Sequence, residues 1–136
     1  MINNKSLSSF KLKNLRKIIS YVPQNAFLFS DTIGDNIKFG KPDAEIIEII
    51  EASKSASIFQ EIKKLNLSFD TMLGERGINL SGGQIQRISI ARGLLKNPEM
   101  ILLDDCLSAV DTDTEENILN NLESKFGEKT KLIISH

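Results

Sequence analysis

The stretch LSGGQ at residues 80–84 continues into Ile85, Gln86 and Arg87 and precedes the apolar stretch MILLDD at residues 100–105. A serine and two glycines at the start of a helix leave backbone N–H groups pointing outward, which favours anion binding. An unbroken apolar run of strand length is typical of a central strand in a parallel sheet. Acids at the end of such a strand suit Mg²⁺. The two stretches together predict an α/β fold with an anion site and a metal site.

The rest of the chain reads as short strands and helices around these two stretches. Pro23 ends the first strand because it cannot donate to a ladder, and Asn97-Pro98 ends the helix that Ser81 caps. The expected elements are a strand at 18–22, a helix from a cap at 31–32 to 39, helices at 43–53 and 58–65, a loop at 69–79, a helix at 81–96, a strand at 100–103, a helix from 112 or 114 to 127, and a strand at 131–135.

Two details of these helices are specific enough to check. Asp43 is the expected N-cap of the helix that ends near Ser53, with Ile46, Ile49 and Ile50 on its apolar face. The helix that follows Ser81 is expected to carry Ile85, Ile88, Ala91 and Leu95 on one face.

Composition narrows the class of protein. The 136 residues are 40% apolar and 26% charged with a net charge of −1, which is ordinary for a globular chain. This charge gives no reason to expect nucleic acid or an anionic membrane surface as a direct partner. No apolar segment approaches the roughly 20 residues that span a bilayer. Cys106 is the only cysteine, which excludes an internal disulfide and fits a reducing cytosol.

Four residues at strand ends could carry chemistry. Asp104 and Asp105 could hold a metal-bound water and orient an attacking water. Gln24 could meet both a water and a metal, and His136 could donate to a phosphate oxygen. Each has an ordinary explanation when taken alone, namely a solvated strand end or an exposed loop residue.

One stretch imitates a phosphate-binding loop. GDNIKFGK at residues 34–41 has one residue too many between its glycines, and Pro42 stands where Ser or Thr is needed. No apolar strand leads into it, whereas the motif requires strand, loop and helix in that order. It is therefore rejected, and no GxxxxGK[ST] loop occurs in the 136 residues.

The motifs of this chain, and the order in which they follow one another, resemble those of the ATPase domain of ABC transporters over essentially the whole chain. Residues 22–24 resemble the Q-loop, LSGGQ matches the signature motif, and Asp104 matches the Walker B aspartate. Residues 108–111 resemble the D-loop, and His136 falls where the switch histidine is expected. The segment FLFS at 27–30 and the sequence GERG at 74–77, similar to the X-loop, indicate the exporter branch.

The resemblance implies the fold class α/β. It implies part of a P-loop NTPase (RecA-like) core with an inserted helical subdomain, lacking the Walker A strand, loop and helix. Residues 1–42 would be a RecA-like part with the Q-loop, 43–96 the helical subdomain with X-loop and signature, and 97–136 a RecA-like part with Walker B, D-loop and switch histidine. The Walker A loop is expected upstream of Met1 and the last strands after His136, so the chain is expected to be a fragment of an exporter subunit.

The resemblance also implies ATP and Mg²⁺ as ligands and a role for each site residue. Asp105, His136 and Gln24 would be catalytic, and Asp104 and Gln24 would hold Mg²⁺, mostly through water. The residues expected to contact nucleotide bound by a partner subunit are Leu80, Ser81, Gly82, Gly83 and Gln84. Ser108 and Asp111 would lie at a dimer interface, and the residues expected to couple to the transmembrane helices are Gly74, Glu75, Arg76 and Gly77.

One position departs from the family pattern. Glutamate usually follows the Walker B aspartate as the catalytic base, and here it is Asp105. The missing methylene draws the carboxylate back by about 1 Å, which can slow a reaction by about 10²-fold. In the family this change beside an intact LSGGQ is common in one half of heterodimeric exporters, whose LSGGQ serves the competent site of the other half.

The expected function is therefore that of an ATPase-domain fragment of an exporter. Its partners would be a second ABC ATPase domain, with a heterodimer favoured, and a transmembrane domain, but not nucleic acid. The parent would act at the cytoplasmic side of the plasma membrane, with the fragment itself soluble. The isolated chain is expected not to hydrolyse ATP. The alternatives are a non-enzymatic remnant or partner-binding fragment, and a soluble ABC ATPase of chromosome maintenance or translation, which the FLFS and GERG segments disfavour.

Overall fold

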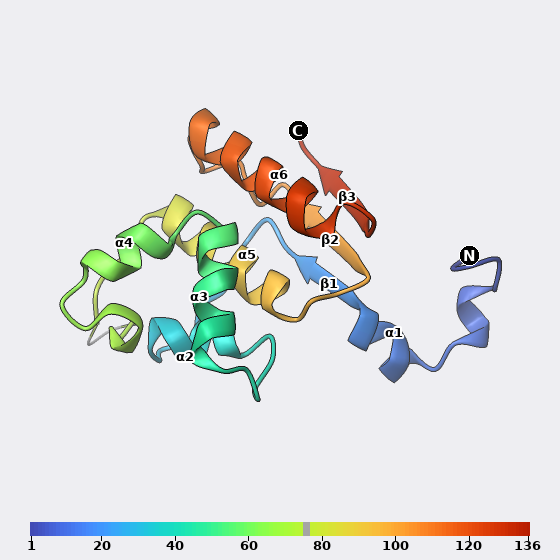
Figure 1. The fold of residues 1–136 in the computed structure, drawn as a ribbon, viewed down its shortest axis with the longest axis horizontal. Helices are drawn as coiled ribbons and strands as arrows, with labels where there is room; N and C mark the ends of the chain where they lie inside the picture. Colours follow the sequence, from blue (N-terminus) through green and yellow to red (C-terminus); the bar gives the residue numbers. More distant parts are fainter. Residues whose placement is uncertain (75–76) are drawn as a thin grey trace.

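The computed structural model describes residues 1–74 and 77–136, and its centre is a parallel sheet. The sheet has the order β1-β2-β3, formed by β1 (Ile19–Val22), β2 (Met100–Asp104) and β3 (Thr130–Ile134). The predicted strands are confirmed, with the apolar run in the middle. Because the strands are parallel, their carboxyl ends lie at one edge of the sheet (Figure 1).

Helices make up both connections between the strands. The link from β2 to β3 contains α6 (Thr112–Phe126). The long link from β1 to β2 contains five helical elements, namely α2 (Ile33–Lys38), α3 (Ile46–Ser55), α4 (Phe59–Lys64), the 3-10 helix η2 (Ser68–Asp70) and α5 (Gly82–Leu95). Before β1 lie η1 (Leu7–Ser9) and α1 (Leu12–Ile18), which the sequence analysis did not predict. Ile18 consequently ends a helix instead of starting the first strand.

Helix α5 lies at the centre of the fold. The predicted apolar face of α5 is largely buried: Ile88, Ala91 and Leu95 are buried and Ile85 is half-buried. The helix is also buried on other sides, which the sequence did not predict, because α5 packs against α2, α3 and β1 at the same time. The residues buried elsewhere on α5 are Gln86, Arg87, Ser89, Ile90, Gly93 and Leu94.

The predicted start of α3 is wrong. Glu45, and not Asp43, is the N-cap, and it forms a reciprocal capping box with Glu48. The helix runs to Ser55, and Ile46, in its first turn, is 58% exposed although Ile49 of the predicted apolar face is buried. Two negative carboxylates at this terminus also suit the helix dipole.

Other helix termini agree with the sequence analysis. Thr32 caps α2 by accepting a hydrogen bond from the backbone N–H of Asp35 at 3.0 Å. Helix α6 begins at Thr112 and ends before Gly127 as predicted, and Asp111 provides its cap. Within the described residues, no helix is both long enough and apolar enough to cross a membrane.

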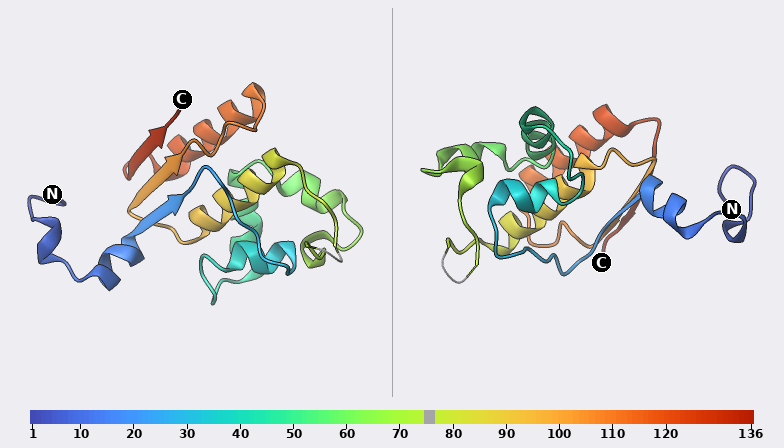
Figure 2. Two further views of the ribbon diagram at one scale, coloured as in Figure 1. Left: turned by 180° about the vertical axis from the view of Figure 1, so that it is seen from behind. Right: turned by 90° about the horizontal axis from the view of Figure 1, so that it is seen from below.

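The two faces of the sheet differ in burial. Val22, Ile101 and Leu103 are buried on the face that carries α5 and α6, which lie on one side of the sheet (Figure 2). On the opposite face Tyr21 is 57% and Leu132 49% exposed. The apolar run of β2 is therefore buried on one face, whereas a central parallel strand was expected to be buried on both.

Candidate functional site

The carboxyl edge of the sheet gathers the predicted strand-end residues. Gln24 lies just beyond β1, Asp105 just beyond β2, and His136 just beyond β3. The side-chain amide Nε2 of Gln24 donates a hydrogen bond to Oδ2 of Asp105 at 2.7 Å. Residues 81 positions apart in the chain are thus brought into direct contact, as parallel pairing of β1 and β2 requires.

Asp104 has a partner that the sequence analysis missed. The Tyr21 hydroxyl donates to Oδ2 of Asp104 at 2.9 Å. This hydrogen bond, desolvation and the adjacent negative charge raise the pKa of Tyr21, so the phenol keeps its proton. The two residues lie on the open face of the sheet, one strand apart, and the contact holds the Asp104 carboxylate in one orientation.

The backbone of Asp105 is fixed from two sides. Its N–H donates to the carbonyl of Ile134 at 2.8 Å, and its carbonyl accepts from the Ser108 hydroxyl at 3.0 Å. Its φ of 47° lies in the left-handed region, where aspartate is tolerated better than most residues. Asp105 therefore combines a side chain one methylene shorter than glutamate with a left-handed backbone conformation.

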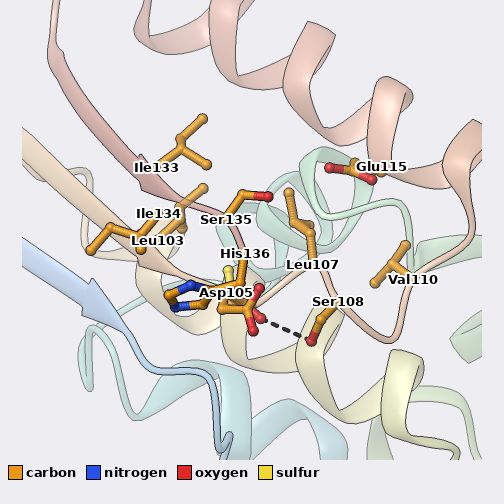
Figure 3. A pocket seen from close by; sticks show the side chains of 11 residues that line it. Leu103, Asp105, Leu107, Ser108, Val110, Glu115, Ile133, Ile134, Ser135 and His136 are labelled. Carbon is orange, nitrogen blue, oxygen red and sulfur yellow. Dashed lines mark hydrogen bonds between the residues drawn. The ribbon is translucent and has the colours of Figure 1, made fainter.

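A cavity of about 270 Å³ opens beside this edge. Asp105, Ser108 and His136 are among the residues that line it (Figure 3). The volume lies below the range of pockets that enclose drug-sized ligands, but it is large enough for a phosphate group. Burial raises the pKa of the nearby Cys106 thiol to about 12, so this cysteine is a packed thiol and not a nucleophile.

The LSGGQ stretch forms the amino end of α5 and lies apart from the strand edge. Ser81 is the N-cap, and its Oγ accepts from the backbone N–H of Gln84 at 3.2 Å. The Gln84 side chain reciprocates, accepting from the Ser81 N–H at 2.9 Å. Because Oγ of Ser81 acts as an acceptor here, its own proton remains available to donate to an anion. Ser81 and Gly82 are both exposed.

The segment 108–111 joins the two groups of residues. Oε1 of Gln86 accepts from the Ala109 N–H at 3.0 Å, and its Nε2 donates to the Ser108 hydroxyl at 3.3 Å. A Cβ on Gly83 would lie 2.7 Å from the Ala109 carbonyl oxygen, so this approach requires glycine. Ser108 therefore contacts both Asp105 and the side chain of Gln86. Gln86 was not predicted as a site residue, although a second glutamine just after LSGGQ was a visible signal.

Asp111 has a local role in the structure. Its carboxylate accepts from the Thr114 N–H at 2.9 Å and caps α6. Hydrogen bonds from the Thr114 backbone and hydroxyl hold the pKa of Asp111 below its usual value. An interface role for Asp111 stays a prediction.

The predicted X-loop is described only in part. Gly74 has a φ of 100°, and a Cβ there would lie 2.5 Å from the Ser30 hydroxyl. This contact connects the loop to the predicted FLFS segment. Glu75 and Arg76 lie outside the described residues, and Gly77 packs against the Met72 carbonyl.

The donor set at the strand edge is suited to Mg²⁺ and not to an all-protein metal cage. Among residues 1–74 and 77–136, no three His, Cys, Asp or Glu side chains gather into a metal-binding group. Two carboxylates and one amide do occur at this edge: Gln24 contacts Asp105, and Asp104 precedes Asp105 at the end of β2. Mg²⁺ commonly takes one or two carboxylates and keeps several waters, so these residues fit that ion.

Comparison with known proteins decides the family. Residues 1–108 match the family model described as ABC transporter. The chain belongs to the ABC transporter family. A solved bacterial Atm1-family ABC exporter with ATP bound superposes on the whole chain with a TM-score of 0.94 at 40% identity, over 24% of that exporter. The resemblance to the ATPase domain of ABC exporters is therefore confirmed.

Curated ABC relatives are longer than this chain. The mitochondrial iron-sulfur clusters transporter ATM1 of Saccharomyces cerevisiae is 43% identical over 138 aligned residues, covering 100% of the chain and 20% of the relative. The lipid A-core flippase 1 of Colwellia psychrerythraea is 42% identical, with 100% and 23% covered. The multidrug resistance-like protein MdlA of Buchnera aphidicola is 49% identical, with 100% and 24% covered. The chain thus spans about a quarter or less of the length of these relatives.

Proposed function

We propose that these residues supply the signature half of an ATP site to a second ATPase domain within an ABC exporter. The observation that carries this proposal is the exposed and reciprocally capped start of α5. These 136 residues include no GxxxxGK[ST] loop, so in the proposed site the P-loop of the partner would bind the phosphates.

The signature side binds through hydrogen-bond donors. The Ser81 hydroxyl keeps its proton available to donate, and the N–H groups of Gly82 and Gly83, the first of α5, have no intrahelical acceptor. Together with the positive end of the helix dipole they suit the γ-phosphate of ATP held by a partner's P-loop. Leu80 and Gln84 hold the turn on either side.

The residues at the carboxyl edge of the sheet would contribute to a second ATP site, the one that belongs to this chain's own ATPase domain. MgATP supplies the phosphoryl group and the Lewis acid when it is bound there. Asp104, held by Tyr21, and Gln24 would bind the metal mainly through water. Asp105 would orient the attacking water, and His136 would donate to a phosphate oxygen. The contact of Gln24 with Asp105 supports this assignment because one amide then senses both metal and base.

The proposed assembly pairs two ATPase domains with a transmembrane domain, at the cytoplasmic side of the plasma membrane. A heterodimer is favoured because Asp105 replaces the usual glutamate while LSGGQ is intact. Segment 108–111 would lie at the dimer interface, since it already contacts both the strand edge and α5.

The proposal predicts ATP-dependent pairing without ATP turnover by the chain alone. The partner in this experiment is an exporter ATPase domain with its own P-loop and with its catalytic glutamate replaced by glutamine, so that ATP stays bound. Sedimentation velocity should show a complex of the two chains with MgATP and none without nucleotide. Turnover by the purified chain alone that is abolished by Asp104→Asn would contradict the proposal, as would pairing that is indifferent to ATP.

A second candidate is a non-enzymatic segment that binds a partner through its open sheet face. The observation in its favour is the exposure of Tyr21, Leu132 and Ile134 on that face, since exposed apolar patches commonly mark interaction sites. A monodisperse chain with a sharp thermal transition would count against a segment that needs a partner in order to fold.

A further inference from the structure

Glu61, on α4, contacts two side chains of α5. Its Oε2 accepts from Nε2 of Gln84 at 2.8 Å, and its Oε1 accepts from the guanidinium of Arg87 at 2.6 Å. Both partners lie more than 20 positions away in the sequence, so the contact joins α4 to the start of α5. No sequence motif pointed to Glu61.

The carboxylate determines which way the Gln84 amide faces. A carboxylate only accepts hydrogen bonds, so the NH₂ group of Gln84 must face Glu61. The Oε1 atom of Gln84 then faces the backbone N–H of Ser81 and accepts a hydrogen bond from it at 2.9 Å. Glu61 therefore completes the capping box from outside the helix, and the reverse orientation of the amide would leave the Ser81 N–H without this acceptor.

Arg87 extends the same contact to the glycine turn. Its side chain is only 11% exposed and donates to the carbonyls of Gly83, at 3.2 Å, and Ser57, at 2.7 Å. Glu61 provides the negative charge that this guanidinium faces. Burial alone would raise the pKa of Glu61, but hydrogen bonds from Arg87 and Gln84 outweigh it and hold the pKa below its usual value. The side chain is consequently an acceptor for both donors at neutral pH.

We propose that Glu61 is a positioning residue for the signature half-site, acting through Gln84 on Ser81 and through Arg87 on Gly83. Through these contacts it fixes the backbone at Ser81 and Gly83, and with it the direction of the first N–H groups of α5. This inference rests on the proposed function, because positioning matters only where these donors meet a phosphate.

Amide exchange in the full 136-residue chain tests the positioning step. In Glu61→Gln the neutral amide no longer enforces one orientation of Gln84. We expect hydrogen exchange at the Ser81 N–H, followed by NMR, to accelerate about tenfold, the effect of losing one typical hydrogen bond. The Asp35 N–H, in the cap of α2, serves as an internal reference and should not change. Gln60→Ala, an exposed substitution on the same helix, should leave both rates as in the wild type.

A second measurement connects positioning to nucleotide. The affinity of the chain for the hydrolysis-blocked P-loop partner in MgATP should fall about tenfold in Glu61→Gln and stay unchanged in Gln60→Ala. Equal acceleration of exchange at Ser81 and Asp35 would overturn the inference, because it indicates general destabilisation. Faster exchange at Ser81 with unchanged affinity would overturn it as well. If the wild-type chain does not pair with the partner, the proposed function fails, and the exchange rates still decide whether Glu61 orients Gln84.

Discussion

Replacing Asp105 with glutamate is expected to raise ATP turnover about 100-fold in an ATPase domain in which a P-loop segment is joined ahead of these residues. The main chain at Asp105 is anchored to Ile134 and Ser108, so it cannot move to compensate for a short side chain. One added methylene carries the carboxylate about 1 Å further toward a bound phosphate, a misplacement large enough to account for this factor. Steady-state phosphate release, measured with a partner domain that supplies LSGGQ, gives the comparison.

The left-handed backbone at this position calls for a matched control. Glutamate at a φ of 47° should cost up to about 1–2 kcal/mol of stability, so the unfolding of each variant is measured beside its turnover. Asp105→Asn, which keeps the size but removes the base, should be slower than the wild type. Turnover by Asp105→Glu that does not exceed the wild-type rate, in a domain that remains folded, would show that the reach of the side chain is not limiting.

Truncating Leu103 is expected to destabilise the chain far more than truncating its neighbour Leu102. Leu103 is 1% exposed on the face that α5 and α6 cover, and Leu103→Ala should lower the free energy of unfolding by about 2–5 kcal/mol. Leu102 points to the open face and is only half-buried, so Leu102→Ala should cost about 1 kcal/mol. Urea denaturation of the two variants and the wild type measures both changes.

The difference between the two losses in free energy of unfolding tests whether the sheet is buried on one face only. Equal losses would mean that the open face is covered in solution, either by self-association or by a rearranged terminus. Sedimentation of the wild-type chain at several concentrations distinguishes these explanations, because only self-association depends on concentration.

The sequence predicted features that depend on local chemistry. An apolar run of strand length predicted β2. Ser81 was correctly identified as a cap, and the cap of α2 was correctly placed at Asp31 or Thr32, because a side-chain oxygen followed by a helical pattern has few other uses. At α3, Asp43 was wrongly predicted as the cap, because the position of the cap depends on the Glu48 side chain completing a capping box with Glu45. The strand edge was predictable because parallel strands bring their carboxyl ends together.

Long-range contacts could not be predicted in the same way. Tyr21 looked like an ordinary strand residue, and its hydrogen bond to Asp104 depends on the register of β1 against β2. Glu61 looked like an exposed helix charge until α4 was placed against α5. The burial of α5 on several sides was missed for the same reason, since periodicity in one helix does not reveal how many neighbours surround it.

The most direct test of the central claim is turnover at a partner's P-loop site that lacks a working signature motif. An exporter ATPase domain with an intact P-loop and glutamate, but with its own signature serine changed to arginine, should hydrolyse ATP poorly alone. Adding this chain should restore turnover. The chain carrying Ser81→Arg should not restore it, whereas Ser124→Arg, an exposed change on α6, should restore it fully. Equal restoration by the wild type and Ser81→Arg, or none by the wild type, would contradict the claim that LSGGQ of this chain acts on a partner's nucleotide.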